Sequence, residues 1–299
     1  MPPLTHQLEQ PVKPQRLVVI GAAGFVGRHL MSAARSEGVD VLALGRADVD
    51  LSAADADEQL GGLCRPSDTV VFAAARAPAK TSEMMVENII MAQVVCAAWR
   101  RSPASHLIYI SSDAVYGEAT FVTETSPTDA SSLHGAMHVA REAMVQSIAG
   151  ATPLAILRPS ALYGAGDPHN SYGPNRFARD AVKSGEISLF GNGEEMRDHV
   201  HVEDLARVVL SCAMRRTSGI LNVALGQSLS FRAVAEHLAF RLEPEPTIHG
   251  SPRQNPVTHR HFDPTLRLTK MPDVTFRSFE QGCSDLLPAA VALTPVSPE

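Results

Sequence analysis

Three glycines with the spacing of a phosphate-binding turn lie near the start of the chain. The segment Gly21-Ala-Ala-Gly24-Phe-Val-Gly27 follows a β-branched run and precedes apolar residues at helical spacing, so a strand should enter the turn and a helix should leave it. Such glycines let backbone N–H groups approach a pyrophosphate at the helix N-terminus. We therefore expect a dinucleotide site, with a simple strand-to-helix turn as the alternative. The expected contacts are Gly21, Gly24, Phe25, Val26 and Gly27.

The residue after the second expected strand bears on which dinucleotide binds. Residues 39–44 are followed by Gly45 and Arg46, with no acidic residue at that point. A carboxylate there would accept hydrogen bonds from the ribose diol and repel a 2′-phosphate, whereas a guanidinium can donate two hydrogen bonds to phosphate. Arg46 therefore favours NADP(H), while NAD(H) stays an alternative in which Arg46 is only a surface charge.

Two histidines four residues apart could carry acid/base chemistry. His134 and His138 fall within residues 131–149, whose apolar spacing predicts a helix, so the two side chains share one face. An imidazole titrates near pH ~6.5 and serves as a general acid or base with little tuning. The same spacing suits zinc, but the sequence places no third ligand, and we predict no metal site.

The segments that position these residues alternate between strands and helices. Apolar runs predict strands at 16–20, 39–44, 69–73, 106–110, 154–157 and 220–224, and helical spacing predicts helices at 25–34, 53–62, 82–101, 131–149 and 230–242. Continuous apolar strands that alternate with helices indicate a parallel sheet covered on both faces, with ligands at its carboxyl edge. The predicted fold class is α/β, a doubly wound parallel sheet of the Rossmann type with a smaller, discontinuous substrate lobe.

Composition shifts suggest how the chain is divided. We assign residues 16–164 and 198–225 to a dinucleotide-binding domain, and residues 165–197 and 226–285 to the substrate-binding lobe. Prolines near both ends predict loose tails over residues 1–15 and 286–299.

Composition also excludes several classes of protein. The chain has 299 residues, of which 44% are hydrophobic and 19% charged, as in a folded globular protein. A net charge of −6 gives no general attraction to nucleic acid or anionic lipid, and no apolar run reaches the roughly 18 residues of a membrane span. Four widely spaced cysteines suit neither a zinc motif nor a disulfide scaffold, so we expect a cytoplasmic protein.

Beyond these patterns, the chain resembles the extended short-chain dehydrogenase/reductase family of nucleotide-sugar epimerases, dehydratases and reductases. The segments that carry the resemblance occur in family order: the glycine turn, Asp50-Leu51, Val70-Val-Phe-Ala-Ala-Ala75, Asn88, Ser111-Ser112-Asp113-Ala-Val-Tyr116-Gly117, Arg158-Pro159-Ser-Ala-Leu-Tyr163-Gly164, Asn175-Arg176-Phe177 and Arg197-Asp198-His-Val-His201-Val-Glu-Asp204. The resemblance implies further cofactor contacts from Asp50, Leu51, Ala73, Ala74, Asn88, Ser111, His138 and Pro159. It also implies substrate contacts from Tyr163, Asn175 and Arg197, to which we add Arg253 as a second cation.

The expected catalytic centre departs from this family. Relatives hold the sugar oxygen with a Ser or Thr at the position of Ser112 and exchange its proton through a Tyr-x-x-x-Lys pair. No tyrosine of this chain has a lysine four residues further on, and His134 and His138 occupy the positions of the pair. In one interpretation His134 is the acid/base and His138 binds the nicotinamide ribose. In another, hydride transfer is lost and Asp113 is a substitute acid.

The resulting prediction is an NAD(P)-dependent epimerase or keto-reductase acting on a nucleotide-linked sugar. The alternative is a member of the family without redox activity that binds a dinucleotide or nucleotide sugar as a sensor, a partner subunit or a non-hydride acid/base enzyme. By resemblance, a homodimer should form through the helices at 82–101 and 131–149.

Overall fold

A seven-stranded sheet forms the centre of the computed structural model, which describes residues 4–253 and 255–293. Its strand order is β1-β11-β7-β5-β4-β2-β3. Six strands run parallel, and the edge strand β1 pairs antiparallel with β11. The bounds are β1 Thr5–His6, β2 Leu17–Ile20, β3 Val41–Leu44, β4 Thr69–Phe72, β5 His106–Ile110, β7 Leu154–Pro159 and β11 Thr217–Val223.

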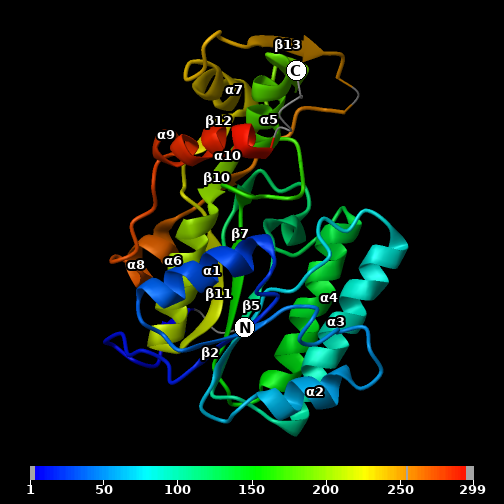
Figure 1. Cartoon of the computed structure of the whole chain (residues 1–299), viewed down its shortest axis with the longest axis vertical. Helices are drawn as coiled ribbons and strands as arrows, with labels where there is room; N and C mark the ends of the chain where they lie inside the picture. Colours follow the sequence, from blue (N-terminus) through cyan, green and yellow to red (C-terminus); the bar gives the residue numbers. More distant parts are fainter. Residues whose placement is uncertain (1–3, 254, 294–299) are drawn as a thin grey trace.

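Helices cover both faces of this sheet (Figure 1). Helices α1 (Phe25–Ser36) and α6 (Val202–Arg215) pack together on one face, whereas α2 (Ala56–Leu63), α3 (Ser82–Arg101) and α4 (Leu133–Ala149) pack on the other. The strand residues alternate between two apolar cores, one under each helix layer. The predicted doubly wound α/β class is therefore confirmed.

A smaller lobe stands above the carboxyl edge of the sheet (Figure 1). It contains the strands β8 (Ala161–Tyr163), β10 (Met196–His201) and β12 (Ser228–Ser230), the parallel pair β9 (Glu186–Phe190) and β13 (Thr247–Ser251), and the helices α5 (Pro174–Ser184), α7 (Phe231–Ala239), α9 (Phe279–Gly282) and α10 (Leu286–Leu293). Shorter elements are β6 (Phe121–Val122) paired with β14 (His261–Phe262), α8 (Thr265–Lys270) and two 3-10 turns at 113–116 and 283–285.

Both predicted tails are wrong in part. Thr5 and His6 extend the large sheet, and Leu4 is buried, because the His6 imidazole hydrogen-bonds Thr217 and the carbonyl of Lys270. At the other end, residues 286–293 form α10, because Leu286 and Ala290 pack against α5 in the smaller lobe. The predictions for residues 1–3 and 294–299 lie outside the described residues.

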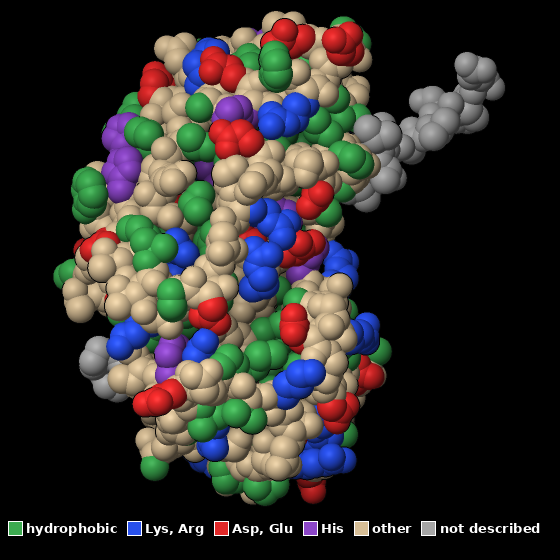
Figure 2. Space-filling model, turned by 90° about the vertical axis from the view of Figure 1, so that its left-hand side faces the viewer, with side chains coloured by type: hydrophobic (Ala, Val, Ile, Leu, Met, Phe, Trp, Pro, Cys, Tyr) green, Lys and Arg blue, Asp and Glu red, His purple; other side chains and the backbone are tan. Residues whose placement is uncertain are grey.

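Two surface properties of the described chain bear on its partners. No helix of residues 4–253 and 255–293 is long and apolar enough to cross a membrane. On the face shown in Figure 2, acidic and basic side chains are interspersed. This face therefore has no continuous basic surface, in agreement with the net charge of −6.

Candidate active site

One large cleft follows the carboxyl edge of the sheet and continues between the sheet and the smaller lobe. Its volume is about 1160 Å³, larger than the roughly 300–1,000 Å³ typical of a site for one small ligand. The strand order reverses between β2 and β4, which is where doubly wound sheets bind their ligands. The cleft can therefore hold two ligands end to end.

The glycine turn forms the floor of this cleft at the start of α1. A Cβ on Gly21, whose φ is +96°, would lie 2.6 Å from the Ala74 nitrogen, and a Cβ on Gly27 would lie 2.2 Å from the Gly21 carbonyl oxygen. Backbone atoms therefore leave no room for a side chain at Gly21 or at Gly27. The first turn of α1 has no side-chain cap and no acidic residue, so its N–H groups remain available to an anion. This geometry fits the pyrophosphate of a dinucleotide.

The adenosine end of the expected site is lined by the residues that follow β3. Arg46, Asp50 and Leu51 all line the cleft. The Arg46 guanidinium is 85% exposed and its Nε donates to Asp50 Oδ2 at 3.2 Å, while Oδ1 of the same carboxylate accepts from the Ser52 backbone and hydroxyl. These hydrogen bonds hold the pKa of Asp50 below its usual value. Arg46 is therefore held only by an exposed contact with Asp50.

The remaining cofactor residues expected from the sequence divide into two groups. Ala73, Ala74, Ser111 and Pro159 line the cleft, since they end neighbouring strands of the sheet. Asn88 does not line it: this fully buried amide accepts from the Arg76 backbone N–H and donates to the carbonyls of Arg76 and Met84. The contact expected from Asn88 is thus corrected to a structural role, because its polar atoms hold the loop after β4.

A buried charged network supports the carboxyl end of β5. Ser111 Oγ donates to Glu142 Oε1 at 2.5 Å, and Arg158 donates to both oxygens of the same carboxylate at 2.9 and 2.6 Å. Arg158 also donates to the hydroxyl of Tyr116, which donates to Asn222. The network joins α4 to β5, β7 and β11, so it fixes the helix that carries the two histidines relative to the sheet.

Ser112 and Asp113 lie at the centre of the cleft, directly after β5. Ser112 Oγ accepts from the Ala114 backbone N–H at 3.2 Å and lies 3.4 Å from Asp113 Oδ1. Arg260 donates to Oδ2 and to the backbone carbonyl of Asp113 at 3.2 and 3.1 Å. The Asp113 carboxylate is thus paired with a cation, while the Ser112 hydroxyl remains part of the cleft wall.

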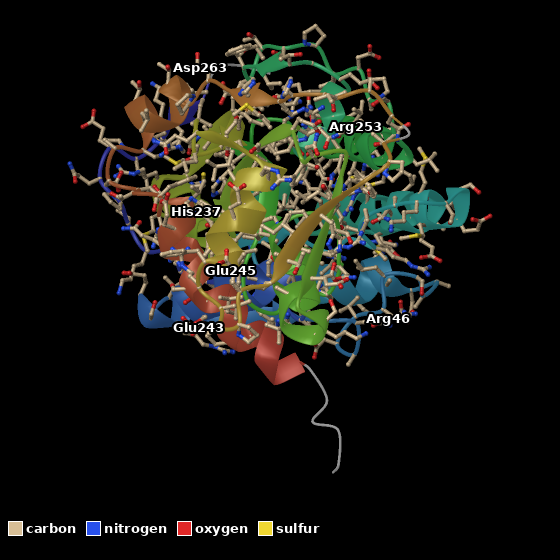
Figure 3. All side chains as sticks on the ribbon, turned by 90° about the horizontal axis from the view of Figure 1, so that it is seen from above. Arg46, His237, Glu243, Glu245, Arg253 and Asp263 are labelled. Carbon is tan, nitrogen blue, oxygen red and sulfur yellow. The ribbon has the colours of Figure 1, made fainter. Side chains whose placement is uncertain are left out.

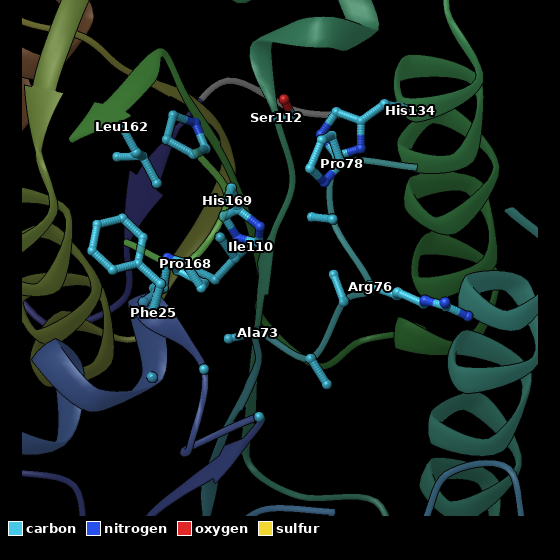
Figure 4. Close-up of a pocket in the computed structure, with 18 of the residues that line it drawn as sticks. Phe25, Ala73, Arg76, Pro78, Ile110, Ser112, His134, Leu162, Pro168 and His169 are labelled. Carbon is cyan, nitrogen blue, oxygen red and sulfur yellow. The ribbon is translucent and has the colours of Figure 1, made fainter. Parts of the chain in front are cut away.

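His134 and His138 both line the cleft from α4, as their spacing predicts. Their ring centroids lie 4.7 Å apart with the ring planes at 87°. Figure 4 shows Ser112 and His134 as neighbours in this view of the cavity, with His169 across it on the side of Phe25. Asp113 lines the same cleft, and its charge acts on His134. Ser112, Asp113 and His134 therefore form one part of the cleft wall, beside which a reacting oxygen could lie.

Each imidazole has one ring nitrogen occupied by the protein. The Ala79 backbone N–H donates to His134 Nδ1 at 3.3 Å, and the Tyr109 hydroxyl lies 2.7 Å from His138 Nδ1. Burial lowers the pKa of both histidines, and for His138 the proximity of His134 and of the Arg141 charge lowers the pKa further. Both side chains are therefore neutral at physiological pH.

The substrate residues expected from the sequence are only partly at the cleft. Asn175 lines it at the start of α5, although its amide bonds both the N–H and the carbonyl of Gly164. Tyr163 does not line it: the ring is 1% exposed and packs against His201 and Phe279. The assignment of Tyr163 to substrate is corrected, because this side chain belongs to the core of the smaller lobe.

Two arginines assigned to substrate are held by other groups. Arg197 donates to the carbonyls of Met196 and Thr258 and to the Thr258 hydroxyl, and it does not line the cleft. Arg253 is paired with Glu194 and Glu195 at 2.8 and 2.7 Å, so its charge is already neutralised. Figure 3 shows Arg253 and Arg46 well apart in the view from above. The assignment of Arg253 as a substrate cation is therefore not supported by its position.

Comparison with known proteins agrees with this geometry. Residues 17–224 match the model of the NAD dependent epimerase/dehydratase family. The chain belongs to this family. A dTDP-6-deoxy-L-talose 4-dehydrogenase (NAD(P)(+)) from Kitasatospora kifunensis is 30% identical over 75% of this chain and 78% of its own length. A dTDP-L-rhamnose 4-epimerase from Burkholderia thailandensis is 31% identical over 55% of this chain, which spans only 47% of that relative.

A solved structure shows the same fold. The NAD complex of UDP-glucose 4-epimerase from Thermus thermophilus superimposes with a TM-score of 0.79 at 22% identity, covering 93% of this chain and 100% of the other. The epimerase/dehydratase fold is therefore retained although most residues differ.

Three residues of this epimerase/dehydratase chain were missed by sequence reasoning. Arg260 reaches Asp113 from the segment before β14, and its charge lowers the pKa of the half-buried Arg197 beyond the effect of burial. His169 and His199 line the cleft from the smaller lobe. Arg260 and His169 lie in segments without apolar periodicity, whereas His199 lies in β10, within the segment at 197–204 that carried the family resemblance.

Proposed function

We propose that this chain is an NAD(P)-dependent epimerase or keto-reductase that acts on a nucleotide-linked sugar. The observation that carries the proposal is one continuous cleft, which joins the glycine turn of α1 to Ser112 and His134 and then to the smaller lobe. A dinucleotide whose pyrophosphate lies at the glycine turn would place its nicotinamide near Ser112 and His134. Membership of a family described as NAD dependent supports the same conclusion.

The chain's own residues would handle the sugar oxygen and its proton. When bound, the dinucleotide accepts or supplies the hydride. Ser112 Oγ, anchored by the Ala114 N–H, would orient the reacting oxygen by hydrogen bonding. His134 would take the hydroxyl proton at Nε2 when the sugar carbon is oxidised, and would return it when the carbonyl is reduced. Asp113 lies next to Ser112 but is paired with Arg260, so we give it the role of positioning these groups.

The proton step requires one local change. With the Ala79 N–H donating to Nδ1, neutral His134 carries its proton on Nε2. To accept a proton at Nε2, the ring must carry the other proton on Nδ1, and the 3.3 Å contact with Ala79 must open. Ala79 lies in the irregular segment between β4 and α3. Its N–H can therefore move away from His134 without breaking a hydrogen bond of a helix or a strand.

The same contact favours a second candidate function. If Ala79 keeps Nδ1 occupied, His134 can donate a hydrogen bond but cannot act as a base. The chain would then bind a dinucleotide or a nucleotide sugar without hydride transfer, as a sensor, a partner subunit or an enzyme of another reaction.

Two features of the site support an anionic substrate and NADP(H). The first turn of α5 borders the cleft without a side-chain cap, so its N–H groups remain available to an anion such as a nucleotide diphosphate. Arg46 would pair with the 2′-phosphate of NADP(H) by leaving Asp50, and NAD(H) would bind without that contact.

We further propose a homodimer formed through α3 and α4. Val86 on α3 is 56% exposed, and Leu133 at the start of α4 is 41% exposed. Exposed apolar side chains on these adjacent helices fit a helix-packing interface.

The test is mass spectrometry of a panel of nucleotide sugars incubated with purified protein, with and without NADP(H) and NAD(H), after separation of epimers. A changed sugar that depends on the dinucleotide supports the enzyme and identifies its reaction. Binding of dinucleotide with no change in any sugar would support the second candidate and refute the first.

A further inference from the structure

A buried polar group lies directly beneath the two histidines. Tyr109, on β5, is fully buried, and its hydroxyl oxygen lies 2.7 Å from Nδ1 of His138 on α4. The two rings are tilted by 38° with centroids 6.0 Å apart, so this contact is made edge to edge through the polar atoms. The phenol does not reach the cleft. It therefore acts on ligands only through His138.

The direction of this hydrogen bond follows from the surroundings of the hydroxyl. Among the described residues, the Tyr109 oxygen has no hydrogen-bond partner other than His138 Nδ1. The Arg141 guanidinium, 5.3 Å from the Tyr109 ring centroid, has only donors, and the Glu142 carboxylate accepts from Ser111 and Arg158. If His138 carried a proton on Nδ1, the phenol proton would have no acceptor at this buried position. The hydroxyl therefore donates, and Nδ1 accepts.

The surroundings also keep His138 uncharged. Arg141 is completely buried, and among the described residues no carboxylate pairs with it; it donates instead to the Ala74 carbonyl at 2.7 Å and to Asn88 Oδ1 at 3.3 Å, above the Phe72 ring. The nearest acid in sequence, Glu142, is occupied by Arg158 and Ser111. A second proton on His138 would place two cations together in a buried site without an opposing charge.

We propose that Tyr109 is a positioning residue that holds His138 as the neutral Nε2–H tautomer, which makes this N–H a fixed donor to an oxygen of the bound dinucleotide. The ring of His138 lines the cleft, and with Nδ1 turned toward β5, Nε2 is the nitrogen left for a ligand. The identity of the ligand rests on the function proposed above. A ribose hydroxyl oxygen is the acceptor that suits an uncharged donor at this point.

The test uses a matched pair of substitutions, Tyr109→Phe and Tyr116→Phe. Both tyrosines are buried, and both hydroxyls make a 2.7 Å hydrogen bond, but the Tyr116 hydroxyl donates to Asn222 and accepts from Arg158, with no histidine among its partners. Nitrogen-15 NMR of the full-length protein, labelled at histidine, reports which ring nitrogen carries the proton. The His138 signals are assigned by their loss in His138→Gln.

In the wild-type protein and in Tyr116→Phe, we expect His138 to show a protonated Nε2 and a bare Nδ1. In Tyr109→Phe, we expect a mixture of tautomers and binding of NADH and NADPH weakened by roughly 2- to 10-fold, as for loss of one oriented hydrogen bond. The Tyr116→Phe variant controls for the loss of a buried hydroxyl, and its comparison with Tyr109→Phe is made on the His138 spectrum.

Two outcomes would overturn the proposal. A protonated Nδ1 on His138 in the wild-type protein does so without any variant, which covers the case in which Tyr109→Phe fails to fold. An unchanged His138 spectrum in folded Tyr109→Phe does so as well. Neither measurement needs turnover, so a protein that leaves every nucleotide sugar unchanged would refute the proposed enzyme while the tautomer assignment stands on the spectrum.

Discussion

The backbone N–H of Ala79 donates to Nδ1 of His134 at 3.3 Å. To accept a proton at Nε2, His134 must carry its own proton on Nδ1, and this hydrogen bond to the main chain prevents that. This distance is at the long end for a hydrogen bond, and the contact comes from a loop without regular structure. Whether His134 exchanges a proton or only donates a hydrogen bond therefore decides between the two candidate functions.

Substitution of His134 separates these roles. Phenylalanine removes both functions, whereas glutamine can donate a hydrogen bond but cannot take a proton. If His134 is the acid/base, His134→Phe and His134→Gln should both lower kcat by about 10²- to 10⁴-fold while the Kd for NAD(P)H stays within about twofold. Steady-state kinetics and fluorescence titration of the bound nicotinamide measure the two quantities. Substantial activity in His134→Gln would show that the imidazole serves only as a donor.

The pH dependence of turnover gives an independent check on His134. Burial is the main cause that lowers the pKa of His134 below the usual value of 6.5; the Asp113 charge opposes this shift, and the proximity of His169 and of the Arg141 charge adds to it. The neutral base is thus the major form at pH 7 and above, and it is lost as the pH falls through the lowered pKa. We expect kcat/KM for sugar oxidation to be level from about pH 7 to 9 and to fall on the acid side with a midpoint below the ordinary histidine value of about 6.5. A midpoint above about pH 7 would point to another group.

The parts of the site that the sequence predicts are those in which function depends on a local pattern. The glycine turn needs only a strand, three small residues and a helix, and the structure places Gly21 and Gly27 where a Cβ would meet backbone. In the same way, helical spacing alone puts His134 and His138 on one face. These residues line the cleft as a consequence of local geometry.

The parts of the site that the sequence does not predict depend on contacts between segments that are far apart in the chain. Arg253 is neutralised by Glu194 and Glu195 because β13 runs beside β9, and Arg260 reaches Asp113 because β14 pairs with β6. Of the four strands, β9 alternates buried and exposed side chains, but its partner β13 and the two-residue strands β6 and β14 have little apolar periodicity. The strand at Thr5 and His6 was missed for a related reason: two residues carry no period, and their partners, Ser218 and Thr217, lie more than 200 residues further along the chain.

The exposed apolar side chains of α3 predict how the chain associates. If α3 forms part of a dimer interface, Val86→Arg should convert the protein to a monomer, because a charge would be buried without a partner. Leu268→Arg is the matched control, since Leu268 on α8 is similarly exposed at 53% compared with 56% for Val86. Light scattering after size-exclusion chromatography gives the mass of each species. A wild-type protein that is already monomeric would rule out the interface.

The buried pair of Glu142 and Arg158 should be a main contributor to the stability of the site. Both side chains are 4% exposed, and Glu142→Gln leaves the Arg158 charge without compensation. We expect the free energy of unfolding, measured in urea, to fall by about 3–5 kcal/mol. Glu236→Gln, which breaks an exposed pair with Arg232 on α7, should cost less than about 1 kcal/mol. Equal losses in the two variants would mean that the buried network does not hold α4 in place.

The choice between NADP(H) and NAD(H) depends on whether Arg46 exchanges Asp50 for a phosphate. The ion pair is exposed at both ends, so little opposes its opening. A guanidinium on a 2′-phosphate forms charge-assisted hydrogen bonds, and Arg46→Ala should therefore weaken NADPH binding by about 10-fold or more and leave NADH binding within about twofold. Arg101→Ala, an exposed arginine paired with Asp57 away from the cleft, is the control. Because the contact is between exposed charges, the preference for NADPH should also shrink as ionic strength rises. Equal effects of Arg46→Ala on both dinucleotides would mean that Arg46 shapes the adenosine end through Asp50, with no direct contact to phosphate.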